Sequence, residues 1–420
     1  MSKKIAILGA GISGLTCAWE IKKKFPEAAL TLFEKNSRPG GWIKTAYHLD
    51  SLFEWGPRSL RLQDADAALL LIAEMGLSNE LIAASSHARN RYILHQGKLV
   101  QLPTSFWELF LCPLTRKCLH TVLKDLVTPN IAQSDISIYE FFSHRFSRKV
   151  ADYFIDPLLK GIFAGDAKEL SMRACFPKIW ALPRSVILGS LSFKKKKKGL
   201  VTLKRGMETL IFALANRLQN EIRLNAEIES FDDFDQVIST LPAHALAKIL
   251  PKSQLQELLE KIPFRSLGVV HLGYSHQLNG NNGFGYLIPS KENDQVLGVI
   301  FDSSIFPEQG KGTRLTVMIG ENGNLKKMAK EHVKKVLGIH VEPTIIESLW
   351  MSNAIPQYPV GFIDELKKIH QAKEAFPNLV LQGTSFYGIS MNQAIQSAKN
   401  IMERIYSYQR REKMSVKYEI

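Results

Sequence analysis

Three glycines near the start of the chain have the spacing that binds the phosphates of a dinucleotide. Gly9, Gly11 and Gly14 form a G-x-G-x-x-G pattern directly after a short apolar run, Ile5–Leu8. In this pattern the first glycine permits a tight turn, the second lets the backbone approach a pyrophosphate, and the third lets a helix pack closely on the preceding strand. A helix that begins near Ile12 would direct its free N–H groups at the phosphates. We therefore predict a dinucleotide-binding turn here.

Two further groups narrow the kind of dinucleotide. Glu34 ends the next predicted strand, about 20 residues after Gly14, where an acid typically binds the ribose hydroxyls. An acid at this position, rather than an arginine, favours an unphosphorylated ribose, as in FAD or NAD. The run Arg38–Trp42 contains a glycine pair, Gly40–Gly41, which suits a loop that closes over a dinucleotide. Flavoproteins of the glutathione-reductase type commonly carry such a segment, so FAD is favoured.

Cations and a second helix start are expected near the same cofactor. Gly56–Pro57 predicts a turn, and Arg58 and Arg61 follow it. Chain proximity places both arginines near a flavin, where we hypothesise that positive charge stabilises the anionic reduced form; two arginines on a solvated face are the alternative. Towards the end of the chain, a strand, a loop and a helix with an apolar stripe follow one another. Ser390 or Asn392 would cap this helix, whose N-terminus would face the cofactor's phosphates or ribityl chain.

Other kinds of catalytic site are not found in the sequence. There is no Ser-His-Asp arrangement, P-loop or H-E-x-x-H motif, and no pair among the 11 histidines has the spacing of a helical metal site. The 4 cysteines form no C-x-x-C pair, so we predict reduced thiols and no metal. We therefore assign the redox chemistry to the bound cofactor and name no catalytic side chain.

The composition indicates a large, basic protein. The 420 residues are enough for two or three domains, and the formal net charge is +14. No nucleic-acid motif accompanies this charge, so we expect an acidic substrate or an anionic membrane surface and no nucleic acid. Phe106–Leu114 suits either a buried helix or a membrane interface, and Lys194–Lys198 suits either a solvated loop or contact with anionic lipid. Because no apolar window reaches about 18 residues, we expect no membrane-spanning helix.

Motifs spread over almost the whole chain resemble those of one family, the FAD-dependent, oxygen-using protoporphyrinogen oxidases. The first motif is shared by many flavoproteins, whereas Gly56–Arg58, Gly161–Pro177 and Ile355–Tyr358 are far more specific. The matching segments are Gly9–Gly14, Gly40–Ile43, Phe53–Arg58, Asn90–Tyr92, Gly161–Gly165, Leu170–Pro177, Val237–Pro242, Gly283–Pro289, Phe306–Glu308, Ile355–Tyr358 and the loop 383–392.

The resemblance implies an extended FAD and the residues that would hold it. The implied cofactor-binding residues are Gly9, Ala10, Gly11, Ile12, Ser13, Gly14, Glu34, Lys35, Gly41, Trp42, Gly56, Pro57, Arg58, Ser59, Ile228, Trp350, Ile389, Ser390 and Met391. Arg91 matches the arginine that meets a substrate propionate, and Phe284, Leu287 and Met318 fall where the family lines its tetrapyrrole pocket. Physical chemistry agrees with these roles, because a guanidinium suits a carboxylate and apolar side chains suit the faces of a macrocycle.

The reaction implied by the resemblance is the oxidation of protoporphyrinogen IX to protoporphyrin IX by oxygen, a late step of haem biosynthesis that forms hydrogen peroxide. Coproporphyrinogen III is an alternative substrate, because the two differ only in side groups. An amine oxidase or a polyene desaturase of the same superfold remains open, as does a flavin-binding scaffold without turnover. We expect a cytoplasmic protein at the inner face of the membrane, with a homodimer considered.

The expected fold class is α/β, with a Rossmann-like FAD-binding domain of the glutathione-reductase type. The resemblance adds an α+β substrate domain and a helical domain that touches the membrane. The predicted segments are 1–85, 200–262 and 376–410 for the FAD-binding domain, 86–199 for the helical domain and 263–375 for the substrate domain.

Overall fold

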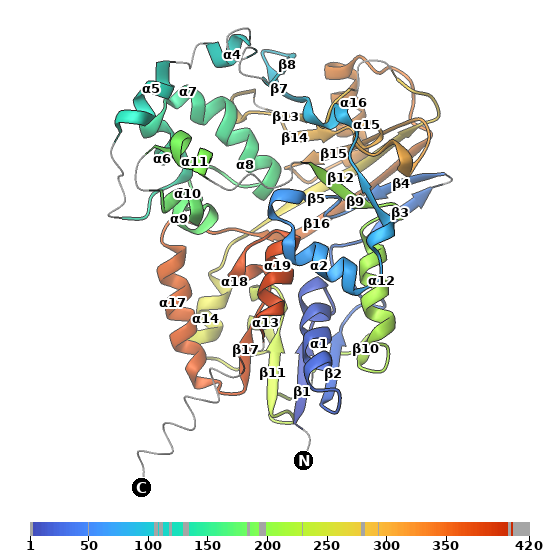
Figure 1. Cartoon of the computed structure of the whole chain (residues 1–420), viewed down its shortest axis with the longest axis vertical. Helices are drawn as coiled ribbons and strands as arrows, with labels where there is room; N and C mark the ends of the chain where they lie inside the picture. The colour runs from blue at the N-terminus through green and yellow to red at the C-terminus, as the bar shows by residue number, and fades with distance from the viewer. Residues whose placement is uncertain are drawn as a thin grey trace.

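The fold consists of two large sheets and a group of short helices (Figure 1). In the computed structural model, a parallel sheet lies in the lower part of the view, a larger mixed sheet at the upper right and the short helices at the upper left. The structure describes residues 3–48, 50–104, 108, 112–116, 120–128, 134–182, 185–192, 199–228, 230–278, 282–292, 294–401 and 405. Lys194–Lys198 and much of Phe106–Leu114, two segments of interest in the sequence, lie outside the described residues.

A parallel sheet joins strands from three separate parts of the chain, with β1 (Lys4–Leu8) at its centre. The strand order is β10-β2-β1-β11-β17, and every neighbouring pair is parallel. The other strands are β2 (Ala29–Glu34), β10 (Ile222–Leu224), β11 (Gln236–Ser239) and β17 (Leu379–Leu381). Both faces of β1 are buried, because Ile5 and Ile7 pack into one core cluster and Ala6 and Leu8 into another. The predicted Rossmann-like sheet is confirmed.

Helices cover both faces of the parallel sheet (Figure 1). The cluster on one face is built with α1 (Ile12–Lys24), α2 (Asp66–Glu74), α12 (Glu208–Arg217) and α19 (Met391–Lys399). The cluster on the other face is built with α13 (Ala243–Ile249), α14 (Gln254–Glu260) and α17 (Phe362–Ala372). The sheet is therefore a buried platform, and ligands reach it only at the ends of its strands.

A mixed sheet of seven strands has the order β16-β12-β15-β14-β13-β7-β8. Its strands are β7 (Arg91–His95), β8 (Lys98–Gln101), β12 (Phe264–Tyr274), β13 (Gly285–Leu287), β14 (Val296–Ile300), β15 (Thr313–Ile319) and β16 (Ile345–Pro356). Neighbouring strands are antiparallel except for β13 and β7, which are parallel. One face is covered by α16 (Leu325–Leu337).

Residues 90–102 predict a hairpin with Gln96–Gly97 as its turn, and the structure confirms it as β7 and β8. Gln96 and Gly97, its turn residues, both have positive φ, at 51° and 74°. This hairpin forms one end of the mixed sheet, although our segment 86–199 grouped it with the helices. The register aligns Arg91 with Gly285, so long-range pairing with β13 decides where the hairpin docks.

Short helices fill most of the described part of residues 113–192 (Figure 1). They are α4 (Pro113–Arg116), α5 (His120–Val127), α6 (Ile138–Arg145), α7 (Arg148–Val150), α8 (Asp156–Phe163), α9 (Met172–Cys175), α10 (Pro177–Trp180) and α11 (Val186–Ser192). Arg145 and Asp125 form an ion pair of 3.1 Å in which both side chains are buried, at 1% and 0% exposure. Asp125 also accepts hydrogen bonds from the Ser185 hydroxyl and from two backbone N–H groups of α11, so one carboxylate joins α5, α6 and α11.

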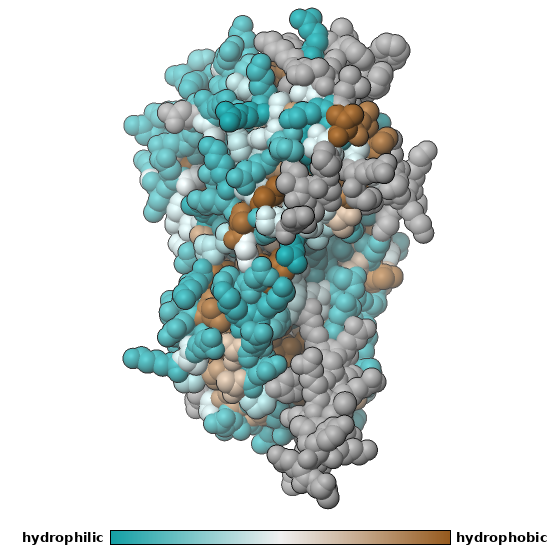
Figure 2. All heavy atoms as spheres, turned by 90° about the vertical axis from the view of Figure 1, so that its left-hand side faces the viewer, coloured by the Kyte–Doolittle hydropathy of each residue, from teal (hydrophilic) through white to brown (hydrophobic). Residues whose placement is uncertain are grey.

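The outer surface of these helices is mostly hydrophilic, with separate hydrophobic groups (Figure 2). Leu126 and Val127 of α5 and Leu188 of α11 are among its exposed apolar residues. Within the described part of the chain, no helix has the length and apolar character needed to cross a membrane.

Two small sheets and two short helices connect the large elements. β3 (Thr45–His48) pairs with β4 (Ser51–Glu54), and the second small sheet has the order β5-β9-β6. The strands of that second sheet are β5 (Leu60–Arg61), β6 (Leu81–Ala83) and β9 (Leu200–Leu203), and the short helices are α15 (Asp302–Ile305) and α18 (Thr384–Tyr387).

Candidate active site

The glycine turn has the geometry that a pyrophosphate site requires. A Cβ atom on Gly14 would lie 1.9 Å from the carbonyl oxygen of Gly9, so only glycine lets α1 approach β1 this closely. A Cβ atom on Gly11 would meet no atom within 4 Å, which means that the backbone there is open to a ligand. The first turn of α1 contains no acidic residue to oppose a phosphate. The turn therefore fits the phosphates of a dinucleotide.

Glu34 lies beside this turn and can hold a ribose. Its side chain is buried, and Oε2 accepts a hydrogen bond of 2.9 Å from the Ala10 N–H while Oε1 accepts from the Asn36 N–H at 3.0 Å. The Asn36 side-chain amide also donates to Oε1, at 2.6 Å. Since a carboxylate has about four acceptor sites, capacity remains for a ribose hydroxyl. Lys35, the next residue, is exposed at the end of the strand.

The loop that contains Gly40 and Gly41 packs directly on the glycine turn. The Gly40 N–H donates to the Ala10 carbonyl at 2.7 Å, and Gly11 and Gly40 form an isolated parallel bridge. Arg38 shapes the loop, because Nη2 donates to the Gly41 carbonyl at 2.7 Å and Nη1 pairs with Glu208 at 3.1 Å. The sequence therefore located two segments that meet at one site.

The segment Gly56–Ser59 lies against the same loop. A Cβ atom on Gly56 would lie 2.1 Å from the carbonyl oxygen of Trp42, and the indole of Trp42 itself is largely exposed. Arg58 pairs with Asp302 at 2.5 Å and donates to the Thr316 hydroxyl at 3.0 Å. Arg58 thus links the predicted cofactor loop to the mixed sheet, and its positive charge is already neutralised by a carboxylate.

Met391, Ser390 and Ile389 lie at the start of α19, which packs beside α1 and α2 (Figure 1). Ser390 caps the helix, because its hydroxyl accepts from the Gln393 N–H while the Gln393 side chain accepts from the Ser390 N–H. Of the two predicted caps, Ser390 is therefore the correct one. Asn392 instead accepts a hydrogen bond of 2.9 Å from the Ala68 N–H, which fixes α19 against α2.

Two residues of the Ile355–Tyr358 motif position this region, although the sequence assigned them no role. The Tyr358 hydroxyl donates to the Thr384 carbonyl and accepts from the Gly388 N–H at 3.1 Å, so it holds the loop that precedes α19. Gln357 donates to the Phe163 carbonyl at 2.9 Å and lies where a Cβ atom on Gly165 would be. The residues of this motif therefore make contacts with segments that are distant in the chain.

The remaining two predicted cofactor residues lie in different places. Ile228 follows β10 and is partly buried, two residues after Ala226, whose N–H donates to the Glu34 carbonyl at 3.0 Å. Trp350 packs against the cluster beneath α16, on the face of the mixed sheet opposite Met318. The structure brings Ile228 towards the Glu34 end of the site and separates Trp350 from the substrate residues.

Four predicted substrate residues lie together on the face of the mixed sheet that α16 leaves free. The strand registers align Leu287, Gly298 and Met318 in one row across β13, β14 and β15. Phe284 joins a cluster with Met318, because Gly285 has a φ of 135° and interrupts the alternation of the strand. The guanidinium of Arg91 lies over the Phe284 ring, 5.3 Å from its centroid.

Helix α8 adds residues that the sequence analysis did not name individually. A Cβ atom on Gly161 would lie 2.7 Å from Cδ2 of Leu287, so glycine lets α8 lie close to the sheet. Leu158 and Ile162, one turn apart beside Gly161, are 41% and 39% exposed. Exposed apolar side chains beside an apolar row are suited to a flat hydrophobic ligand.

Two buried carboxylates join the predicted cofactor loops to the start of α12. Glu54 accepts hydrogen bonds from the Met207 N–H at 2.6 Å and from the Thr45 hydroxyl at 3.0 Å, while Glu208 accepts from the Thr45 N–H at 3.0 Å. The pKa of Glu54 is raised to about 8. Burial is the largest cause and Glu208 adds to it, while the Met207 and Thr45 hydrogen bonds and Arg58 oppose it.

We expect Glu54→Gln to stabilise the protein in mildly alkaline solution. Since folding raises this pKa from about 4.5 to about 8, the contribution of Glu54 is fully favourable below pH 4.5 and is lost as the pH rises through 8. The melting temperature of the variant minus that of the wild type should therefore increase between pH 5 and pH 8. A constant difference across this range would contradict the assignment, and Glu27→Gln, at an exposed glutamate, serves as the control.

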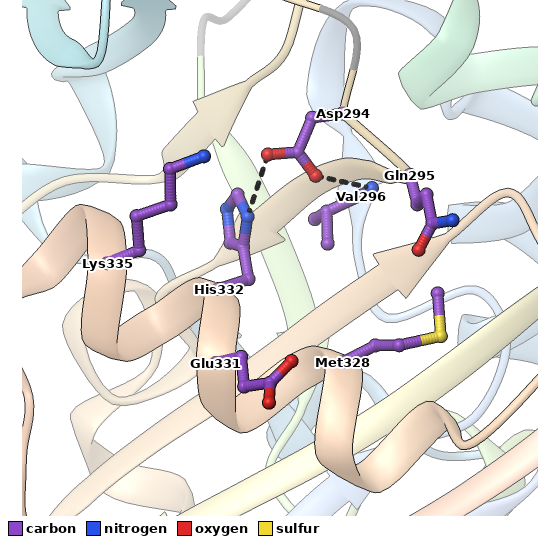
Figure 3. A pocket seen from close by; sticks show the side chains of 7 residues that line it. All are labelled: Asp294, Gln295, Val296, Met328, Glu331, His332 and Lys335. Carbon is purple, nitrogen blue, oxygen red and sulfur yellow. Dashed lines mark hydrogen bonds and ion pairs between the residues drawn. The ribbon is translucent and has the colours of Figure 1, made fainter.

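A separate pocket lies between α16 and the turn before β14 (Figure 3). His332 pairs with Asp294 at 3.2 Å through Nδ1 and with the Tyr286 hydroxyl at 3.0 Å through Nε2. Burial raises the pKa of Tyr286 well above 10, so this hydroxyl stays neutral. The pocket lies on the α16 side of the sheet and contains none of the predicted site residues. Among the described residues, no group of three His, Cys, Asp or Glu side chains is arranged to hold a metal.

The class of protein follows from a family comparison. The sequence model of the flavin-containing amine oxidoreductases matches residues 12–405. The chain belongs to the flavin-containing amine oxidoreductase family, and it is a flavin-dependent oxidoreductase whose cofactor is FAD. The residues described above fit this cofactor, with an open backbone at Gly11 for the pyrophosphate and a carboxylate at Glu34 for the ribose.

Several known proteins are similar to this chain over almost its whole length. The chain is 30% identical to protoporphyrinogen oxidase of Bos taurus, over 96% of this chain and 98% of the relative. It is 27% identical to coproporphyrinogen III oxidase of Bacillus subtilis, over 97% of this chain and 98% of the relative. A crystal structure from Exiguobacterium sp. 255-15, of a protein assigned as a protoporphyrinogen oxidase, has a TM-score of 0.84 at 23% identity and covers 96% of this chain and 99% of that one. The last comparison supports the fold alone.

Proposed function

We propose that the protein oxidises a porphyrinogen to the porphyrin, with protoporphyrinogen IX as the first candidate substrate and oxygen as the electron acceptor. The observation that carries this proposal is the placement of Arg91 over Phe284, next to the apolar row of Leu287 and Met318. A cation at the edge of a flat apolar surface matches a macrocycle with carboxylates on its rim. The similarity to protoporphyrinogen and coproporphyrinogen oxidases over almost the full chain supports the same class of substrate.

In this proposal the protein contributes binding and orientation. When bound, FAD would accept a hydride from the substrate and pass the electrons on to oxygen. The glycine turn and α1 bind the pyrophosphate, and Glu34 binds a ribose hydroxyl. Leu287 and Met318 support one face of the macrocycle, α8 excludes water beside it, and Arg91 binds a carboxylate so that a bridge carbon is held towards the flavin.

Coproporphyrinogen III is the second candidate, since the Bacillus subtilis relative is named for it. An amine oxidase is disfavoured by the free cation at Arg91, which would repel a protonated amine, and a polyene desaturase gains nothing from that charge. Purified protein should be incubated with each porphyrinogen while porphyrin fluorescence and hydrogen peroxide are followed. Rapid formation of both products with either substrate is expected, and absence of both would reject the proposal.

We expect Arg91→Ala to weaken substrate binding selectively. Loss of a charge-assisted hydrogen bond costs about 1.5–3 kcal/mol, which corresponds to a KM increase of roughly 10- to 100-fold. FAD should remain bound, because Arg91 lies over Phe284 and not at the glycine turn. The measurement is the KM for protoporphyrinogen together with the flavin absorbance of the purified variant. An unchanged KM would remove Arg91 from the site, and Arg205→Ala, at an exposed arginine, is the matched control.

Three predictions of the sequence stay predictions. They are contact of residues 86–199 with an anionic membrane, a cytoplasmic location at the inner membrane face, and a homodimer. The exposed Leu126, Val127 and Leu188 are compatible with membrane contact. The lysine run that prompted the membrane prediction lies outside the described residues.

A further inference from the structure

We propose that Arg61 is a second carboxylate-binding residue of the substrate site and that Arg61 and Arg91 together bind two neighbouring carboxylates of one ligand. The sequence analysis placed Arg61 near the flavin, and nothing else assigns it a role. The inference rests on the proposed function and adds that tight substrate binding requires two carboxylates on the substrate.

The strand register brings Arg61 to the substrate residues. Arg61 on β5 is aligned with Leu200 on β9. Leu200 packs into the same small cluster as Phe284 and Met318. Arg91 lies over the Phe284 ring, 5.3 Å from its centroid. Two guanidinium groups from separate sheets therefore border one apolar cluster.

The two arginines act on each other as like charges. The pKa of Arg91 is lowered, first by partial burial over Phe284 and second by the positive charge of Arg61. Both residues are exposed, so water screens this repulsion and its cost is small. A ligand with two carboxylates would be attracted by both positive charges at once.

Neither charge is effectively neutralised by the protein. Arg91 makes no ion pair with any residue that the structure describes, and Arg61 has only Asp64, at 3.9 Å, with side chains that are 58% and 62% exposed. An exposed pair at this distance contributes little. Arg58, by contrast, is buried against Asp302 at 2.5 Å. Arg61 and Arg91 are thus available for a ligand, whereas Arg58 serves the fold.

The chemistry that fits this pair is a flat apolar ring with two acidic arms on one edge. Each guanidinium can bind one carboxylate through two parallel hydrogen bonds. The apolar faces of the ring would lie on Leu287 and Met318, and Met318 packs against the same small cluster as Phe284, the ring that Arg91 covers. A porphyrinogen with adjacent propionates has this shape, and its ester does not carry the charge.

The test compares substrate acids with their esters. The KM values for protoporphyrinogen IX and for its dimethyl ester are measured with the wild type, Arg61→Gln, Arg61→Lys and Arg205→Gln. Arg205 is an exposed arginine two residues after β9, so its substitution is the control that removes the same charge elsewhere. We expect Arg61→Gln to raise the KM for the diacid about tenfold, or about 1.4 kcal/mol, and to leave the KM for the ester within about twofold. Arg61→Lys should recover most of the loss, and Arg205→Gln should behave as wild type.

An unchanged KM for the diacid in Arg61→Gln, or an equal increase for acid and ester, would overturn the inference. If Arg61→Gln instead loses FAD or shifts the flavin reduction potential while KM is unchanged, the inference is also overturned. Arg61 would then act on the flavin, as the sequence suggested. In each of these cases the wild type still oxidises the diacid, so the proposed function stands. A wild type that oxidises neither substrate would overturn both.

Discussion

Replacing Gly14 with alanine is expected to unfold the dinucleotide turn and to remove FAD. The added Cβ atom would lie 1.9 Å from the backbone oxygen of Gly9 and 3.0 Å from the Thr240 hydroxyl. Backbone atoms cannot yield here, because the Gly9 N–H donates to Phe33 and Thr240 donates to the Leu8 carbonyl. A substitution that forces such overlap in a packed core costs about 3 kcal/mol or more. Urea unfolding of the protein freed of FAD measures this cost.

The matched control is Gly11→Ala, which distinguishes an effect on folding stability from an effect on FAD binding. No atom lies within 4 Å of its added Cβ, and Gly11 has φ −70° and ψ 178°, which alanine adopts easily. We expect its unfolding free energy without FAD to stay within about 1 kcal/mol of the wild type. FAD affinity should nevertheless fall, because the methyl group occupies the space through which the pyrophosphate approaches. Equal destabilisation by the two substitutions would contradict this division of roles.

Replacing Asp302 with alanine is expected to have the second largest effect, on both stability and FAD retention. Asp302 pairs with Arg58 at 2.5 Å, accepts a hydrogen bond of 2.6 Å from the Thr316 hydroxyl and lies near the buried Arg314. Its loss would leave two largely buried guanidinium groups without a counter-charge. Breaking such a buried pair from one side costs about 3–5 kcal/mol. The measurement is the melting temperature with and without added FAD.

Arg58→Ala and the double variant test this explanation. After loss of Arg58, Asp302 still has Thr316 and Arg314, so we expect Arg58→Ala to be less damaging to stability than Asp302→Ala. The double variant should cost less than the sum of the two single variants, because the pair is removed together. Additive losses would show that the ion pair does not couple the Gly56–Ser59 loop to the mixed sheet.

Local sequence patterns predicted much of the cofactor site. The glycine turn, the acid at Glu34, the hairpin turn at Gln96 and Gly97, and the cap at Ser390 each depend on neighbouring residues, and each is present in the structure. Such features can be predicted because turns, caps and parallel strands are decided by short-range sterics and hydrogen bonds. Strand β16 was not predicted, since its side chains are neither continuously apolar nor strictly alternating.

Long-range partners could not be predicted in the same way. Nothing in the chain near Arg58 indicates Asp302, and nothing near Tyr358 indicates the loop at Gly388. The sequence therefore suggested that Arg58 acts on a flavin, whereas its guanidinium is paired inside the protein. The same limit applies to Arg61. It comes near Arg91 because β5 pairs with β9 while β13 pairs with β7, and neither pairing can be read from the residues around Arg61.

The sequence by itself determined the class of the protein: a dinucleotide turn, an acid for the ribose and motifs of an FAD-dependent family. These are local signals, since one backbone conformation and one helix start define the phosphate site. Only the tertiary structure decided which side chains share one face of the mixed sheet and which arginines, among the described residues, are paired with a buried carboxylate. Register across β13, β14 and β15 aligns Leu287 with Met318, and a buried carboxylate neutralises Arg58 but not Arg91. Charge and shape at a site depend on all residues that fold towards it, and folding brings those residues together from distant parts of the chain.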